Sequence, residues 1–127
     1  FKGYRYGLFA LAFSPDGKIL ASGGCEQLLS EDSCATSQVK IWDIETAKEL
    51  KAMVMRKGII TSLSFDLGGK ILASAGTDKI VRLWDVGTGN ELASWQGEKA
   101  VFSKDGKLFA FSSGRIIKVL ELKQKTE

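Results

Sequence analysis

The sequence repeats itself, and this repetition limits the fold more than any other property of the chain. The stretch KILASAGTDKIVRLWDVGTGNEL at residues 70–92 has a close copy, which opens with KILASGG at Lys18 and ends in VKIWDIETAKEL. A more divergent third copy, AVFSKDGKLFAFSSG, begins at Ala100. The aligned phenylalanines of the three copies are Phe13, Phe65 and Phe102. Because one short repeat cannot bury its own apolar faces, tandem copies are expected to stack against each other.

Each of the first two copies predicts four short antiparallel strands, termed a, b, c and d in chain order, and the third predicts strands a to c. Strand a leads into a turn such as Pro15-Asp16-Gly17, where proline presets φ and glycine accepts a positive φ. Strand c alternates between two faces in VKIWDI from Val39 and IVRLWDV from Ile80. β-branched residues and glycine dominate, so these segments favour strands over helices.

Three motifs together resemble the WD-repeat family of β-propellers. They are FKGYRYGLFALAF at residues 1–13, SPDGKILASGG at 14–24 and VKIWD at 39–43. The two Trp-Asp pairs begin at Trp42 and Trp84, a spacing that lies within the roughly 40–45 residues of one propeller blade. The resemblance implies an all-β fold of about three four-stranded antiparallel blades, arranged as an open arc or as part of a larger ring.

We expect one partial β-propeller over the whole chain, 1–127. Its expected parts are repeat one at 4–52 with an insertion at 25–38, repeat two at 53–96 and a degenerate repeat three at 97–127. The third repeat is short before Phe102 and is therefore expected to be the least stable.

Three blades do not close a ring, because propellers typically have about four to eight blades. Both ends of the arc are expected to present apolar faces. The remaining blades would come from a longer parent chain, which we favour, or from a second copy in a homo-oligomer. In the second case Phe1–Tyr4 would add a strand to the partner's last blade.

The resemblance also implies a hydrogen-bonded network in each blade, made in the family by His, Ser or Thr, Asp and Trp, which satisfy one another's buried polar groups. The matching residues of repeat two are Ser74, Asp78 and Trp84, with Arg56 in the His position. Arg56 would either pair with Asp78 or be solvated. Those of repeat one are Tyr4, Ser22, Thr36 and Trp42, with Tyr4 in place of His and Thr36 in place of Asp. Repeat three keeps none of the four.

Members of the family typically bind partners on the narrow face around the central channel. By the family pattern, the residues that point to this face are Gly7, Phe9, Ile59, Thr61 and Thr77. They are apolar or neutral, so a protein or peptide partner suits them better than a phosphate. Packing between blades is the alternative role for Phe9 and Ile59.

The insertion at 25–38 is the most distinctive local feature, since loops on a rigid scaffold often carry function. Cys25 and Cys34 lie nine residues apart and either form a disulfide or remain two free thiols, as is usual in a cytosolic protein. The acidic residues of the insertion are Glu26, Glu31 and Asp32. They indicate a solvated hairpin tip or, as the less favoured alternative, a cation site.

The composition argues against several function classes. The chain has no histidine and two cysteines, so we expect no catalytic residues, no metal and no cofactor. A net charge of +3, without a basic face, argues against a nucleic-acid partner. No apolar run reaches the roughly 20 residues of a membrane helix, so no membrane partner is expected.

These observations predict a non-catalytic protein–protein interaction scaffold and not an enzyme, with a cytoplasmic location. Two alternatives remain. One is a self-assembling propeller piece that closes a ring with copies of itself, and the other is a non-catalytic part of a larger enzyme or sensor protein. The sequence SPDGKILASGG resembles bacterial WD repeats, which predicts a bacterial source.

Overall fold

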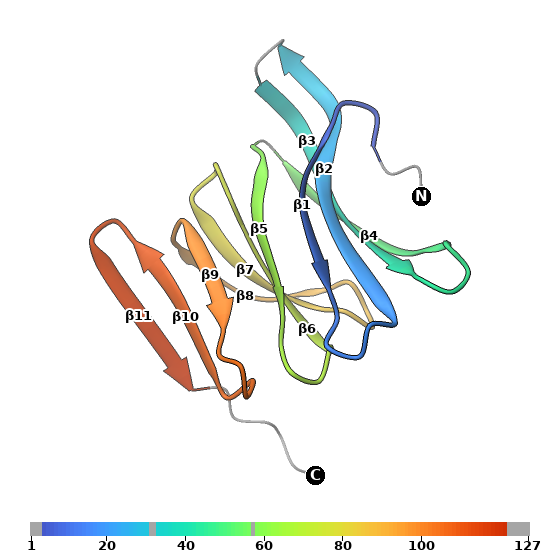
Figure 1. The fold of residues 1–127 in the computed structure, drawn as a ribbon. Helices are drawn as coiled ribbons and strands as arrows, with labels where there is room; N and C mark the ends of the chain where they lie inside the picture. The colour runs from blue at the N-terminus through green and yellow to red at the C-terminus, as the bar shows by residue number, and fades with distance from the viewer. Residues whose placement is uncertain (1–3, 31–32, 57, 122–127) are drawn as a thin grey trace.

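A computed structural model describes residues 4–30, 33–56 and 58–121, except the side chains of Ser33 and Arg56. The described chain is all-β and forms three antiparallel sheets of four, four and three strands (Figure 1). None of the described residues forms a helix that could cross a membrane.

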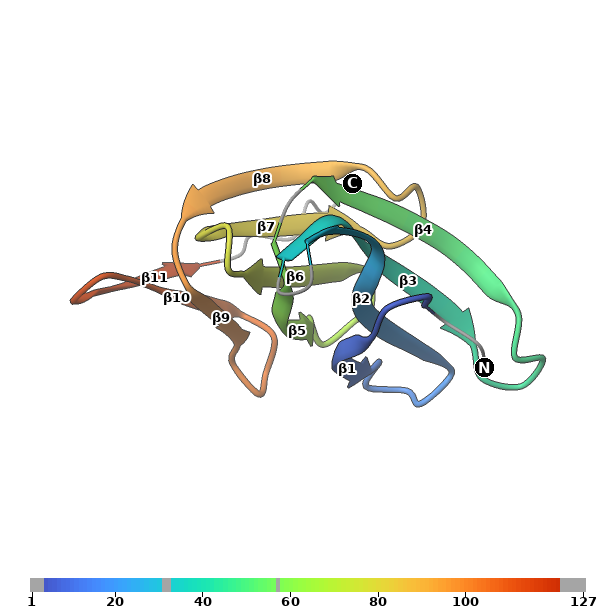
Figure 2. The same cartoon turned by 90° about the horizontal axis from the view of Figure 1, so that it is seen from above.

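The three sheets follow one another along the chain as blades one, two and three. Blade one consists of β1 (Leu8–Phe13), β2 (Ile19–Ser30), β3 (Ser33–Asp43) and β4 (Glu49–Arg56). Blade two consists of β5 (Ile60–Phe65), β6 (Ile71–Gly76), β7 (Ile80–Asp85) and β8 (Glu91–Gln96). Blade three consists of β9 (Lys99–Phe102), β10 (Leu108–Ser113) and β11 (Ile116–Glu121). Figure 2 shows the three a strands, β1, β5 and β9, along one side of the arc and the d strands β4 and β8 along the other.

The a–b turns of blades one and three are built from the same hydrogen bonds. The Ser14 hydroxyl donates to Asp16 Oδ1 at 2.6 Å, and the Ser103 hydroxyl donates to Asp105 Oδ1 at 2.6 Å. These bonds, supported by a backbone N–H two residues further on, hold the pKa of both carboxyl groups below its usual range. The repeated sequence therefore makes the same turn twice because each serine and aspartate organises its own backbone.

Blade two reaches the same turn with a different residue. Asp66 stands in the serine position, and its Oδ1 accepts the N–H groups of Lys70 at 2.9 Å and Ile71 at 3.0 Å. A single buried carboxylate thus accepts the backbone hydrogen bonds that a serine and an aspartate share in the other two blades.

The aspartate of each Trp-Asp pair organises the c–d turn that follows it. Asp43 Oδ1 accepts the N–H of Glu45 at 3.0 Å. Asp85 Oδ1 accepts the N–H groups of Gly87 at 2.9 Å and Thr88 at 3.1 Å. These carboxylates therefore stabilise turns, in agreement with their position at the end of strand c.

Each blade has two apolar faces, which alternate along the strands. In blade two, Leu72 pairs with Trp84 on the face toward blade one, and Ala73 pairs with Leu83 on the face toward blade three. We call the first the leading face and the second the trailing face. The same register recurs in the other blades, so each blade has a leading and a trailing face of its own.

The core lies between the blades. The trailing face of blade one packs on the leading face of blade two, through Ala21, Val39, Ile41, Met53 and Met55 on one side and Ile60, Phe65, Leu72 and Trp84 on the other. The trailing face of blade two packs on blade three, through Ala73, Ala75, Val81 and Leu83 against Ala100, Phe102, Phe109 and Phe111. Blade three is held by aromatic packing, since Trp95 of β8 stacks on Phe111 at a ring distance of 5.3 Å.

Candidate partner-binding face

Two residues predicted for the partner-binding face lie directly against each other at the start of blade two. The Ile59 N–H donates to the Thr77 hydroxyl at 2.8 Å, and the Thr77 N–H donates to the Ile59 carbonyl at 2.9 Å. The connection between blades one and two is thereby fixed to the β6–β7 turn. The Thr77 side chain remains exposed beside it.

Gly7 and Phe9 form a second local group, at the start of blade one. Gly7 has a φ of 133°, and a Cβ atom at this position would lie 3.2 Å from the Phe9 ring. Glycine is therefore required for both the backbone conformation and the close approach of the ring. Thr61 is exposed on β5, with its hydroxyl 3.4 Å from the Ala75 carbonyl.

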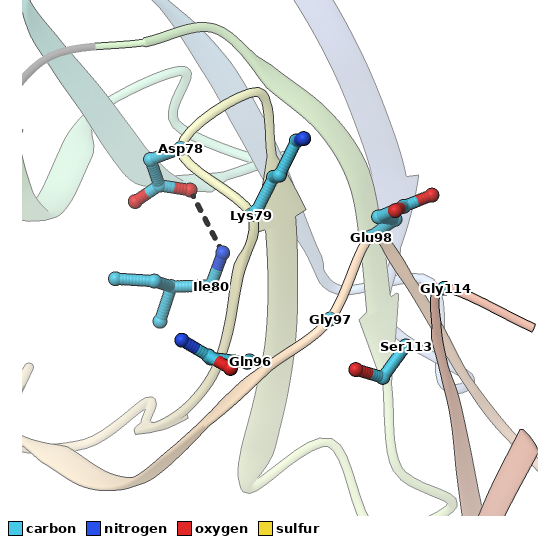
Figure 3. A pocket seen from close by; sticks show the side chains of 8 residues that line it. All are labelled: Asp78, Lys79, Ile80, Gln96, Gly97, Glu98, Ser113 and Gly114. Carbon is cyan, nitrogen blue, oxygen red and sulfur yellow. Dashed lines mark hydrogen bonds between the residues drawn. The ribbon is translucent and has the colours of Figure 1, made fainter. Parts of the chain in front are cut away.

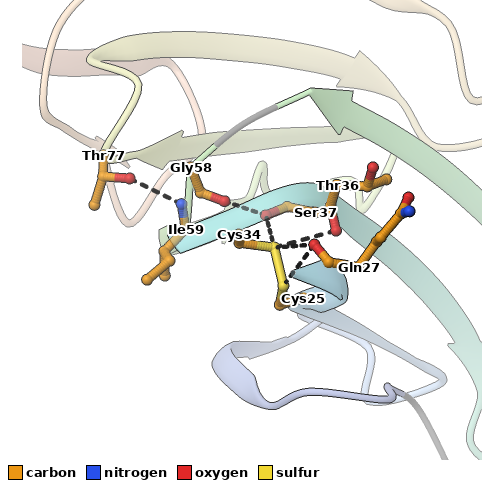
Figure 4. Close-up of a disulfide and its surroundings, with 8 residues drawn as sticks. All are labelled: Cys25, Gln27, Cys34, Thr36, Ser37, Gly58, Ile59 and Thr77. Carbon is orange, nitrogen blue, oxygen red and sulfur yellow. Dashed lines mark hydrogen bonds between the residues drawn. A yellow bond between two sulfur atoms is a disulfide. The ribbon is translucent and has the colours of Figure 1, made fainter. Parts of the chain in front are cut away.

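The insertion continues the β2–β3 hairpin beyond the blade, and Cys25 and Cys34 form a disulfide within it (Figure 4). Their Cα atoms lie 5.9 Å apart, and both residues are buried. The structure thus has a cross-link where two free thiols were the alternative. Glu31 and Asp32 lie outside the described residues, and among the described residues no group of three or more His, Cys, Asp and Glu side chains could hold a metal ion.

The disulfide hairpin is attached to the segments that precede the a strands of two blades. The Cys25 carbonyl accepts the Tyr6 N–H at 3.1 Å, just before β1. The Cys34 carbonyl accepts the Gly58 N–H at 3.1 Å, just before β5, and the Ser37 hydroxyl donates to the Gly58 carbonyl. One hairpin therefore positions the segments where β1 and β5 begin. Gly7 and Ile59 lie just before these strands, and Phe9 and Thr61 lie in them.

An open cleft of about 480 Å³ lies between blades two and three, where the β6–β7 turn, the β8–β9 connection and the β10–β11 turn meet (Figure 3). Its lining residues are Asp78, Lys79, Ile80, Gln96, Gly97, Glu98, Ser113 and Gly114. Sequence reasoning missed this cleft, because it assigned Asp78 to the blade network alone. The repeat pattern could have indicated the cleft. In a propeller, the b–c turns and the d–a connections meet at one edge.

The predicted network of blade one forms around a single serine. The Tyr4 hydroxyl donates to the Ser22 carbonyl at 2.7 Å and lies 2.9 Å from the Ser22 hydroxyl, which also accepts the Trp42 Nε1–H at 2.8 Å. Burial raises the pKa of Tyr4 to about 12. In the part of the chain that the structure describes, no side-chain hydrogen bond joins Thr36 to this group. Thr36 lies in the displaced backbone of the insertion, where it pairs with Gln27, and its place in the network stays a prediction.

The network of blade two is smaller than predicted. Trp84 Nε1 donates to the Ser74 hydroxyl at 2.8 Å, and both residues are buried. Asp78 does not join them: its carboxylate pairs with Arg82 Nη1 at 2.7 Å. The side chain of Arg56, the predicted partner of Asp78, lies outside the described residues. Arg82 can reach Asp78 because strand c begins directly after the turn that holds this aspartate.

The sequence was compared with known protein families and curated proteins. The model of the WD40 family, described as WD domain, G-beta repeat, matches residues 1–43 and 49–85. The chain belongs to the WD40 repeat family. WD40 repeats are usually non-catalytic scaffolds, and WD-repeat domains commonly bind proteins.

Individual relatives support the same assignment. The chain is 30% identical to eukaryotic translation initiation factor 3 subunit I of Neurospora crassa, over 95% of this chain and 35% of that protein. It is 34% identical to the periodic tryptophan protein 2 homolog of Schizosaccharomyces pombe, over 60% of this chain and 8% of that protein. It is 38% identical to pre-mRNA-processing factor 19 homolog 2 of Arabidopsis thaliana, over 61% of this chain and 13% of that protein. The WD40 chain thus spans well under two thirds of these relatives, which are eukaryotic and give no support to a bacterial source.

The buried Ser74–Trp84 hydrogen bond yields a stability prediction. Replacing Ser74 with alanine leaves the indole N–H of Trp84 without its acceptor, so we expect the free energy of unfolding to fall by about 1–3 kcal/mol. Denaturant unfolding monitored by tryptophan fluorescence measures the change. Ser94→Ala, at an exposed position of β8, is the matched control and should change stability by less than about 0.5 kcal/mol. Equal effects of the two substitutions would contradict the assignment.

The raised pKa of Tyr4 yields a pH prediction. Folding raises this pKa from 10.0 to about 12, so the neutral phenol stabilises the fold fully below pH 10, and that contribution is lost as the pH rises toward 12. Unfolding experiments from pH 8 to 12 should show a smaller loss of stability for Tyr4→Phe than for the original chain. Tyr6→Phe, at an exposed position, should leave the original pH dependence in place. Parallel curves for all three proteins would disagree with burial as the cause.

Proposed function

We propose that this WD40 chain is a non-catalytic protein-interaction scaffold, and that its partners bind along the edge that carries Gly7, Phe9, Ile59, Thr61 and Thr77. The observation that carries the proposal is the open cleft of about 480 Å³, which lies beyond Thr77 at this edge. Phe9, Thr61 and Thr77 are exposed there, while backbone hydrogen bonds hold the segments on which they stand. A rigid edge with exposed side chains suits recognition because little order is lost on binding.

The lining of the cleft favours an extended peptide or a protein loop as the ligand. Ile80 offers an apolar contact, and the side chains of Gln96 and Ser113 offer hydrogen bonds. Lys79 and Glu98 bring opposite charges, so the cleft does not concentrate positive charge for a phosphate. This mixture of short-range polar and apolar groups is typical of peptide recognition.

The disulfide hairpin makes the edge asymmetric, which supports a specific rather than a general binding role. The Gly58 N–H donates to the Cys34 carbonyl at 3.1 Å, and the Gly97 N–H donates to the Lys79 carbonyl at 2.9 Å, so the two connections between blades are anchored alike. The hairpin extends beyond the hydrogen bond between Gly58 and Cys34. The hydrogen bond between Gly97 and Lys79 instead borders the open cleft. The partner would therefore be held between blades two and three and flanked by the hairpin.

The chain spans only a part of each of these relatives. This supports the view that further blades are the partners of this scaffold, within a larger ring. The alternative in which the chain is a non-catalytic part of a larger enzyme or sensor protein stays a prediction. A cytoplasmic location stays a prediction, and disulfides such as Cys25–Cys34 are more usual in oxidising compartments.

Peptide selection by phage display on the immobilised, oxidised chain tests the proposed face. Selected peptides should lose affinity by about tenfold or more on Thr77→Ala, beside the cleft, and on Lys79→Ala, in its lining, because each substitution removes an exposed contact there. Leu92→Ala, at an exposed position of β8, is the control and should leave affinity unchanged. Titration by fluorescence anisotropy gives the Kd values. Peptides that bind all variants equally would place recognition elsewhere and overturn the proposal.

A further inference from the structure

The disulfide lies in the part of the β2–β3 hairpin where strand pairing is irregular. The register shifts three times between Cys25 and Ser30, and Cys25 pairs with Ser37 rather than with Cys34. Such shifts interrupt the backbone hydrogen bonds that hold two strands together. The bond between the two sulfur atoms therefore supplies a cross-link where the strand pairing alone is interrupted.

The cross-linked hairpin holds the connection between blades one and two. The Cys34 carbonyl accepts the Gly58 N–H at 3.1 Å, and the next residue, Ile59, exchanges two hydrogen bonds with Thr77 (Figure 4). Gly58 has a φ of 99°, and a Cβ atom at this position would lie 2.9 Å from the Thr77 hydroxyl oxygen. The connection thus fits closely against the β6–β7 turn, so a displacement of Gly58 also displaces the turn.

The β6–β7 turn forms one wall of the cleft between blades two and three. Lys79 in this turn has a φ of 62°, in the left-handed region that a residue with a side chain seldom adopts unless its surroundings hold it there. The Lys79 carbonyl accepts the Gly97 N–H at 2.9 Å, and both residues line the cleft (Figure 3). A continuous series of contacts therefore runs from the disulfide to the cleft.

We propose that Cys25 and Cys34 form a redox switch that sets the affinity of the cleft for its peptide or protein partner. The inference rests on the proposed function, because it concerns the regulation of the same site. With the disulfide intact, the hairpin holds Gly58 and the turn, and the cleft keeps the shape that binds. With the disulfide reduced, the irregular part of the hairpin opens more readily, the turn loosens and the partner binds more weakly.

A dithiol reduces the switch by thiol–disulfide exchange. One thiolate of the dithiol attacks one sulfur of the bridge, forms a mixed disulfide and releases the other cysteine as a thiolate. The second thiolate of the dithiol then displaces the protein. The dithiol leaves as a disulfide, and Cys25 and Cys34 gain two electrons and two protons. Both cysteines are buried, so the attack requires the hairpin to open first, which its interrupted pairing favours.

Hydrogen exchange measured by NMR on the free 127-residue chain tests the structural step without a partner. Reduction by dithiothreitol should speed the exchange of the Gly58 and Thr77 amides by about fivefold or more, while the amides of β6 keep their protection. Unchanged exchange at Gly58 would overturn the proposal. Protection lost throughout β6 would overturn it as well, because the disulfide would then support the whole fold rather than one edge.

Affinity measurements on the same chain test the regulatory step. The probe is a cysteine-free peptide, selected on the oxidised chain, whose binding is weakened by Thr77→Ala. Its Kd by fluorescence anisotropy should rise by about fivefold or more when dithiothreitol reduces the chain, and should return to the original value on reoxidation. The double variant Cys25→Ser/Cys34→Ser is the matched control, and it should bind as weakly as the reduced chain with or without dithiothreitol.

The outcomes separate the switch from the proposed function. Equal affinity of the oxidised and reduced chains for this peptide would overturn the switch and leave the proposed function in place. A further loss of affinity that dithiothreitol causes in the double variant would overturn the switch too, because the disulfide would not be its cause. If no selected peptide responds to Thr77→Ala or to Lys79→Ala, the proposed function fails, and the switch fails with it.

Discussion

The structure depends on the packing of one sheet face against the next. A four-stranded sheet has two apolar faces, and only a neighbouring sheet can cover each of them. Leu72 and Ala73 show this most simply, because adjacent residues of β6 point to opposite sides and enter two different cores. Among the described residues, the middle blade packs against a neighbouring blade on both faces, whereas each outer blade packs against a neighbouring blade on one face. We therefore expect the middle blade to be the most stable of the three.

The polar side chains act locally and set how each sheet is connected. Turn aspartates accept backbone hydrogen bonds at the a–b and c–d turns, and a serine accepts the indole N–H of the tryptophan in blades one and two. Blade three has Phe111 where those blades have a serine, and Trp95 stacks on its ring. The same position can therefore hold either a hydrogen bond or an aromatic contact, provided that the face stays buried.

Much of the fold could be predicted from the sequence because its determinants are local. Alternation along strand c gives the two faces, and Pro15-Asp16-Gly17 gives a turn without reference to the rest of the chain. The candidate site was harder, because it depends on contacts that the repeat pattern does not contain. The pairing of Asp78 with Arg82 requires the path of a particular turn, and the bond from Ser37 to Gly58 requires the path of an insertion found in one repeat only. The cleft between blades two and three arises from three separate segments, so no single motif marks it.

We infer that burial between blades, rather than strand pairing within them, contributes most of the stability of this chain. Hydrogen exchange measured by NMR for individual backbone amides tests it directly, since exchange reports the local free energy of opening. β6 and β10 are both inner strands with neighbours on either side in their sheets, but only β6 has both faces covered. If packing between blades dominates, exchange should be slowest in β6 and measurably faster in β10. Equal protection of the two strands would contradict it.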